Sequence, residues 1–163
     1  MNTPFTETPS GLLPRLYAWF SDFSSYLQSP LLLVIRLYWG WQFFLTGKGK
    51  LEHLDKVTEF FTGLSIPFPA ANAAFVGFTE CAGGLLLLFG LGSRLISIPL
   101  AVLLSVAYLT ADLDAVEEIF SDPSKFLAAD PFLFLFAVVI VLAFGPGRFS
   151  LDALLGRKFG FRP

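Results

Sequence analysis

Residues 70–91 read AANAAFVGFTECAGGLLLLFGL, an almost entirely apolar run of 22 residues. It is long enough to cross a bilayer as a helix, because a crossing takes about 20 predominantly apolar residues. Its one charged side chain, Glu80, lies near the middle. A charge at the bilayer centre costs at least about 2.5–3.5 kcal/mol, so Glu80 is expected to face the interior of a helix bundle.

A charge of opposite sign, Arg36, lies in the preceding apolar stretch, residues 30–45. Helical spacing places small residues on the same face as each charge, and small residues let helices approach closely. These residues are Gly40 and Gly47 beside Arg36, and Ala73, Gly77 and Gly84 beside Glu80. Counted from the cytoplasmic ends of their spans, Arg36 lies at a depth of about 9 Å and Glu80 at about 15 Å. We therefore predict that the two faces pack and that Arg36 pairs with Glu80, either to form a functional pocket or only to fix the helix register.

The composition indicates a membrane protein. Apolar residues make up 55% of the 163 positions, 20 residues are phenylalanine, and the mean hydropathy is +0.68. Four apolar stretches, residues 30–47, 70–91, 94–111 and 131–144, predict an all-α integral membrane four-helix bundle with the lipid bilayer as its surroundings. The net charge of −2 and the lack of a basic stripe argue against nucleic acid as a partner.

The segments outside the spans predict two amphipathic surface helices. The first lies before the first span, within an N-terminal segment of residues 1–29, and the second covers residues 50–63. Pro30 is expected to begin the first span, since proline suits the first turn of a helix. Residues 126–129 are expected to extend the short fourth span across the end of the acidic loop at residues 112–130. Ser150 is expected to cap a basic tail helix within residues 148–163, after the membrane domain at residues 30–147.

The basic residues outside the spans predict the orientation. One side holds Arg15, Arg94, Arg148, Arg157, Lys158 and Arg162, and the other holds Lys48, Lys50, Lys56 and Lys125. Because loops on the cytoplasmic side carry more Lys and Arg, both termini are predicted to be cytoplasmic and the protein to be a multi-pass protein of the inner membrane.

The third span adds polar side chains in one stripe. Ser97, Ser105, Tyr108 and Asp112 share a face of this helix, although packing alone would explain the two serines. The candidate buried polar pocket therefore consists of Arg36, Glu80, Ser105, Tyr108 and Asp112.

Metal and thiol chemistry have few ligands in this chain. Cys81 is the only cysteine and His53 the only histidine. An intrachain disulfide, a bis-histidine haem and a Cys/His zinc site are therefore not expected. A buried small apolar role is the simplest interpretation of Cys81.

Several motifs in a fixed order give the chain a family likeness. Over roughly residues 30–155 it resembles the DoxX family of small four-span bacterial membrane proteins. The matching positions are Arg36, Gly47, Lys50, Glu80, Gly83, Gly84 and Arg94, followed by Gly145, Pro146, Gly147, Arg148 and Asp152. The family often has a histidine near the end of the third span, where this chain has Tyr108 and Asp112.

The resemblance implies two classes of function. Members are linked to membrane redox chemistry, including a thiosulfate:quinone oxidoreductase subunit, and to oxidative or thiol stress. The first hypothesis is therefore a subunit or accessory of a quinone- or thiol-linked redox system, with quinone as the cofactor it allows and with a protein partner or a second copy of the chain. The second is a non-enzymatic membrane scaffold, chaperone or transport accessory in a stress or metal-homeostasis system. Copurifying quinone would distinguish them.

Overall fold

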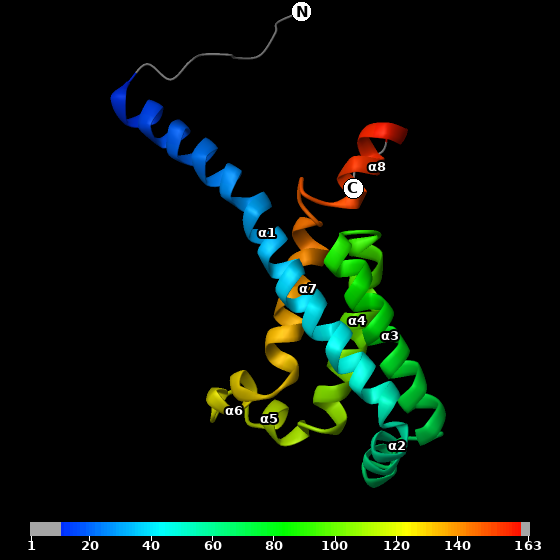
Figure 1. The fold of residues 1–163 in the computed structure, drawn as a ribbon. Helices are drawn as coiled ribbons and strands as arrows, with labels where there is room; N and C mark the ends of the chain where they lie inside the picture. Colours follow the sequence, from blue (N-terminus) through cyan, green and yellow to red (C-terminus); the bar gives the residue numbers. More distant parts are fainter. Residues whose placement is uncertain (1–10, 161–163) are drawn as a thin grey trace, which may run out of the picture.

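A computed structural model describes residues 11–160, and within this range every regular element is an α-helix. The helices are α1 (Leu12–Glu52), α2 (Leu54–Gly63), α3 (Pro69–Phe89), α4 (Ser93–Thr110), α5 (Leu113–Glu117), α6 (Pro123–Ala128), α7 (Pro131–Phe144) and α8 (Leu151–Phe159). The second half of α1 packs against α3 and α7, and α4 packs against the same two helices to complete the bundle (Figure 1). The short helices α2, α5 and α6 lie at one end, and α8 lies at the other end with the α3–α4 turn (Figure 1). The all-α fold is thus confirmed.

Glycines bring α1 and α3 into close contact. A Cβ atom built on Gly84 would lie 2.5 Å from the backbone nitrogen of Phe44 and 2.6 Å from the carbonyl oxygen of Gly40. A Cβ on Gly47 would overlap the backbone of Cys81. The predicted packing face of α3 is buried, as is the face of α1 that carries Arg36, Gly40 and Gly47.

A second layer of packing joins α4 and α7 to this pair. The buried apolar core consists of Phe43, Leu87, Leu100, Leu104, Val138 and Val141. Gly83 faces this core, because a Cβ there would lie 3.1 Å from the side chain of Leu100. Phe134 of α7 packs edge-on against Phe43, which ties α7 to α1. Each of the four long helices therefore contributes to one interior.

The helix boundary predicted at Pro30 is wrong. Pro30 lies inside α1, which continues for 41 residues from Leu12, so within residues 11–160 no separate surface helix precedes the predicted first span. A proline inside a helix removes one hydrogen bond, yet the residues on both sides of Pro30 favour helix and none adopts a left-handed conformation. The surface helix predicted between the first two spans is present as α2, and its start at Leu54 follows the break at His53. Residues 1–10 of the predicted N-terminal segment and residues 161–163 of the tail lie outside the described range.

The acidic segment between α4 and α7 is also more ordered than predicted. It contains the short helices α5 and α6, and Ala129 between α6 and α7 has an extended backbone, with φ −63° and ψ 140°. The expected extension of the fourth span through residues 126–129 is therefore wrong. The N-terminal end of α7 is set by Pro131, which lacks the N–H that would continue a helix from the preceding turn.

The turns at the end of the bundle that carries α8 agree with those predicted from the sequence. Gly90 and Gly92 both have positive φ, at 70° and 58°, in the predicted α3–α4 turn. Ser150 caps α8, since its Oγ accepts a hydrogen bond of 3.1 Å from the backbone nitrogen of Ala153. The predicted tail helix is confirmed.

Two of the described helices, α3 and α4, are long and apolar enough to cross a membrane. Helix α7 is apolar throughout but has only 14 residues. Large apolar side chains are exposed on the outer faces of all four bundle helices, including Val34, Trp41, Phe75, Phe78, Leu95, Val102, Phe136 and Val139.

Candidate functional site: two charged sites at different levels of the bundle

Arg36 lies at the end of the bundle that carries α8. Its side chain is 1% exposed, and its Nη2 donates a hydrogen bond of 2.5 Å to the carbonyl oxygen of Phe149. Its Nε and Nη1 are buried without a hydrogen-bond partner among the described residues. Gly90 makes room for the guanidinium, because a Cβ there would overlap Nη1 of Arg36. Arg36 thus joins α1 to the segment before α8 and keeps unused donor capacity.

Asp152 organises the same end of the bundle. Its carboxylate accepts hydrogen bonds from the backbone nitrogens of Gly92, at 2.7 Å, and Ser93, at 3.0 Å. These two groups belong to the start of α4, where backbone N–H groups lack partners within the helix. The backbone nitrogen of Asp152 also donates to the carbonyl oxygen of Gly90 at 2.9 Å. A residue from the tail therefore supplies the cap that the sequence of α4 does not contain.

The remaining motif residues of the tail pack around this point. Gly145, at φ 78°, lies against Arg94, since a Cβ there would be 3.1 Å from the guanidinium nitrogens Nε and Nη2. Gly147 also has φ 78°, and its carbonyl oxygen accepts a hydrogen bond of 2.7 Å from Ser150 Oγ. The turn from Gly145 through Pro146 to Arg148 thus connects α7 to α8. We call Arg36, Gly90, Arg94, Gly145–Arg148, Phe149 and Asp152 the tail cluster.

Glu80 is the second buried charge. It is 4% exposed, and its Oε2 accepts a hydrogen bond of 2.5 Å from Nζ of Lys50. The Lys50 side chain is 31% exposed, so this ion pair reaches from the α1–α3 interface toward the surface. The pair sits next to the close contact made by Gly47 and Gly77.

The predicted pairing of Arg36 with Glu80 is wrong. The glycine contacts set Gly40 opposite Gly84 and Leu88, and antiparallel packing then places Arg36 opposite Gly90. Glu80 is ten residues from Gly90, which corresponds to about 15 Å along α3. The predicted depth of Arg36 was counted from Pro30, but α1 does not begin at Pro30. The count therefore made the distance between Arg36 and Glu80 along the bundle too small. The two charges therefore belong to different sites.

The polar residues of α4 do not join either charge. Ser105 is exposed, and its Oγ donates to the carbonyl oxygen of Ala101 in its own helix. Tyr108 is buried, donates a hydrogen bond of 2.9 Å to the carbonyl oxygen of Phe126 and stacks on the Phe126 ring. Asp112 is half-buried at the start of α5. Tyr108 thus anchors α6, and the five candidate residues do not form one pocket.

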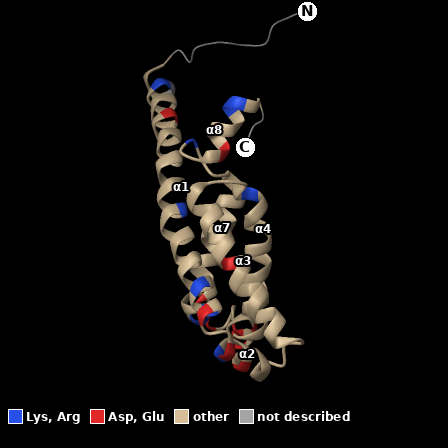
Figure 2. Cartoon of the chain, turned by 45° about the vertical axis from the view of Figure 1, so that its right-hand side comes forward, with Lys and Arg blue, Asp and Glu red and all other residues tan. Residues whose placement is uncertain are grey.

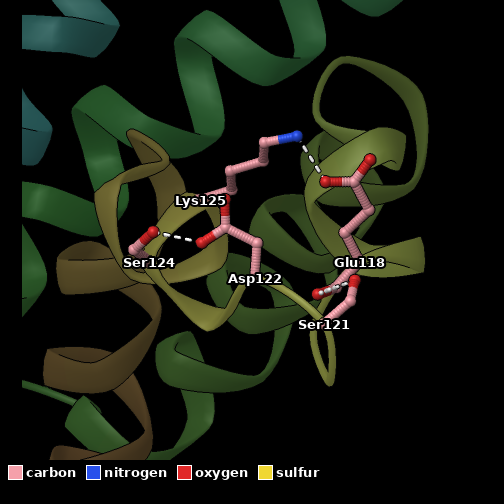
Figure 3. Close-up of polar contacts among 5 residues, drawn as sticks. All are labelled: Glu118, Ser121, Asp122, Ser124 and Lys125. Atoms are coloured by element: carbon pink, nitrogen blue, oxygen red, sulfur yellow. Dashed lines mark hydrogen bonds and ion pairs between the residues drawn. The ribbon is translucent and has the colours of Figure 1, made fainter.

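The α5–α6 segment carries its own exposed polar network. Lys125 pairs with Glu118, and Ser124 donates to Asp122 (Figure 3). Ser121 Oγ donates to the carbonyl oxygen of Glu118 at 3.2 Å. The hydrogen bond with Glu118 raises the pKa of Lys125, and the hydrogen bond from Ser124 lowers the pKa of Asp122. Because these groups are exposed, their ion pair and hydrogen bonds contribute little to the free energy of unfolding. Their main effect is on the local conformation of the α5–α6 segment.

Two hollows open beside the tail cluster. One, of about 200 Å³, lies between α1 and the tail and is lined by Gln28, Ser29, Leu32, Phe144, Pro146, Gly147, Arg148 and Ala153. The other, of about 520 Å³, is mostly apolar and is lined by Leu86, Leu91, Gly92, Leu95, Ile96, Pro99, Asp152 and Leu155. Residues 11–160 contain no cluster of three His, Cys, Asp or Glu side chains that could hold a metal ion.

The comparisons with known proteins agree with the motif positions. The sequence profile of the family named DoxX matches residues 31–113. The chain belongs to the DoxX family. Two relatives are similar to this chain over most of their own length. An "Uncharacterized protein" of Haemophilus influenzae is 26% identical over 132 residues, which cover 78% of this chain and 85% of the relative. The "Putative oxidoreductase CatD" of Bacillus subtilis is 30% identical over 117 residues, which cover 63% of this chain and 86% of the relative. No solved structure is significantly similar to this chain.

The structure of this DoxX protein gives most motif residues a physical role that sequence reasoning missed. Lys50 reads from the sequence as a solvated residue of a surface helix, yet it is the partner of Glu80. Lys50 follows Gly47 by three residues and so lies one turn later on the packing face of α1. This spacing was the feature of the sequence that could have predicted the pairing with Glu80. No local sequence pattern could have predicted the contact of Asp152 with α4, because Asp152 and Ser93 are 59 residues apart in the sequence.

Proposed function

We propose that this DoxX protein is a four-span integral membrane protein of the inner membrane. It would serve as a subunit or accessory of a quinone- or thiol-linked redox system that responds to oxidative stress. The observation that carries the proposal is the buried guanidinium of Arg36 at one end of an apolar bundle, where two of its donor nitrogens have no partner within residues 11–160. The name of the Bacillus subtilis relative supports the redox class.

The four spans would be the second half of α1, then α3, α4 and α7, within a membrane domain of residues 30–147. The exposed apolar side chains on the outer faces of these helices support contact with lipid. Helix α7 is about 21 Å long, shorter than the roughly 30 Å hydrocarbon core, and local thinning of the bilayer would accommodate it.

Reporter fusions test the four-span arrangement. We expect a fusion after residue 160 to report the cytoplasm and a fusion between Asp112 and Asp130 to report the opposite compartment, because α7 separates the two sites. A fusion in the α3–α4 turn at Leu91 should match the first. The same compartment for all three fusions would contradict the arrangement.

A quinone is the cofactor class that the Arg36 site would suit. Its carbonyl oxygens are acceptors and its ring and tail are apolar. These features would suit a buried cation with two donor nitrogens unpaired within residues 11–160, in a cluster whose Asp152 lines the mostly apolar hollow. Bound quinone would supply the electron-transfer chemistry. Arg36 would orient a carbonyl oxygen by donating a hydrogen bond, and the tail cluster would hold the guanidinium in place.

Quinone retained through purification tests this site. We expect protein purified in mild detergent to carry quinone and Arg36→Lys to carry several-fold less, because lysine keeps the charge but loses the fork of donors. Arg15→Lys, an exposed change on the same helix, should retain the parental amount. Quinone absent from the parent, or equal in the parent and Arg36→Lys at matched thermal stability, would remove the quinone assignment.

One observation favours the alternative of a non-enzymatic scaffold, chaperone or transport accessory in a stress or metal-homeostasis system. Two side chains of the tail cluster bond to backbone groups on either side of α8, as Arg36 does to Phe149 and Asp152 to the start of α4. Such bonds fix the position of α8, which would suit a docking role. A folded parent protein that retains no quinone would favour this function.

A further inference from the structure

The two ends of the bundle carry opposite charge. The end with α8 holds exposed cations and few acids, whereas acidic side chains dominate the end with α2, α5 and α6 (Figure 2). The first set is Arg15, Arg94, Arg148, Arg157 and Lys158, with Asp22 and Asp152. The second set is Glu52, Asp55, Glu59, Asp112, Asp114, Glu117, Glu118, Asp122 and Asp130, with Lys48, Lys50, Lys56 and Lys125.

Helix α8 combines these cations with an apolar surface. Leu151, Leu154 and Phe159 are exposed, while Arg157 and Lys158 occupy its last turn. The helix is held at its start by Ser150 and Asp152, and its exposed apolar residues have no cover within residues 11–160. A helix with an apolar surface and cations beside it is typical of binding at an anionic membrane interface.

The larger hollow lies between this helix and helices α3 and α4. Its apolar walls are Leu86 of α3, Leu95, Ile96 and Pro99 of α4, and Leu155 of α8. Asp152 also lines it, with its carboxylate bonded to the backbone nitrogens of Gly92 and Ser93. Lys158 follows Leu155 by three residues and therefore lies one turn further along the same face of α8. The hollow thus offers apolar walls for a hydrocarbon chain and has a cation one turn beyond its α8 wall.

We propose that the hollow between α3, α4 and α8 binds an anionic phospholipid of the surrounding leaflet. One acyl chain would lie against Leu95, Ile96 and Leu155, and Lys158 would attract the phosphate-bearing headgroup. Arg157, on the opposite face of α8, would add to the local positive potential. The charge asymmetry of the bundle supports an anionic lipid over a zwitterionic one. The inference rests on the membrane arrangement proposed above, but not on quinone binding.

Native mass spectrometry in detergent tests this inference with equimolar phosphatidylglycerol and phosphatidylcholine of the same acyl chains. We expect the parent to retain phosphatidylglycerol preferentially. The double variant Arg157→Gln, Lys158→Gln should lower that preference by about fivefold for each cation removed. The matched variant Lys48→Gln, Lys56→Gln removes two exposed cations at the acidic end and should leave the preference unchanged. Circular dichroism melts should show all three proteins equally folded, because the changed side chains are exposed.

The outcomes separate the inference from the membrane proposal. Equal retention of the two lipids by the parent, or an unchanged preference in the α8 variant, would overturn the lipid site and leave the membrane proposal standing. Retention of neither lipid by a parent that stays soluble without detergent would overturn both. Displacement of phosphatidylglycerol by free glycerol phosphate at the same concentration would show a headgroup site alone and contradict the acyl groove.

Discussion

Replacing Gly84 with alanine should lower the free energy of unfolding by about 3 kcal/mol, the upper part of the range for overpacked cores. The new Cβ would meet backbone atoms of α1, namely the nitrogen of Phe44 at 2.5 Å and the oxygen of Gly40 at 2.6 Å. Because backbone atoms cannot rotate away as a side chain can, the two helices must separate along their whole contact. Thermal melts in detergent, followed by the helical circular dichroism signal, measure the effect.

Gly49 provides the matched control on α1. Nothing lies within 4 Å of the position where its Cβ would be. Gly49→Ala should therefore stabilise the protein by about 0.5–1 kcal/mol, because alanine favours helix over glycine. Equal melting temperatures for Gly84→Ala and Gly49→Ala would mean that α1 and α3 do not touch as described.

Replacing Lys50 with methionine should cost about 3 kcal/mol, since it leaves the Glu80 carboxylate buried without its partner. Glu80→Gln should cost less, because the Lys50 side chain is 31% exposed and can turn toward water. The double variant Lys50→Met, Glu80→Gln should be milder than the sum of its two single changes. A double-mutant cycle from melts of the parent, both singles and the double measures this coupling.

The exposed pair of Lys48 and Glu52 is the control for that cycle. These side chains are 3.6 Å apart at a spacing of four residues and are 54% and 57% exposed. Their coupling should be only about 0.3–0.5 kcal/mol, as for other exposed helix pairs. A coupling between Lys50 and Glu80 no larger than this would contradict the buried pair, and so would a strong coupling between Arg36 and Glu80.

The sequence predicts the helices of this fold better than the contacts between them. Apolar length and the glycine spacing give α3, α4 and α7 and the buried face that carries Glu80, because each depends on a local pattern. The partner of Arg36 depends on the register between α1 and α3, which a few glycine contacts fix and which no local pattern records. Proline at position 30 misled the depth count, since its intrinsic preference for a helix start was overridden by helical neighbours on both sides.

The motif positions include the charged residues of both sites, but the sequence does not show how these residues are grouped. Lys50, Glu80, Arg36 and Asp152 all stand among the motif positions, yet the structure divides them between a buried ion pair and the tail cluster. Helical spacing placed Ser105 on the same face of α4 as Tyr108. Ser105 lies at the edge of that face and is exposed, whereas Tyr108 is buried. Long-range pairing of this kind requires the tertiary fold.

The bond from Arg36 to Phe149 has a consequence for the order of synthesis. The ribosome adds Phe149 113 residues after Arg36, which at 5–20 residues per second is a delay of roughly 6–23 s. During that interval the guanidinium has no acceptor in the tail, and the start of α4 also waits for the carboxylate of Asp152. Groups early in the chain therefore depend on the tail for their hydrogen-bond partners. A nascent chain that stalls before residue 149 would leave the Arg36 guanidinium and the start of α4 without these partners.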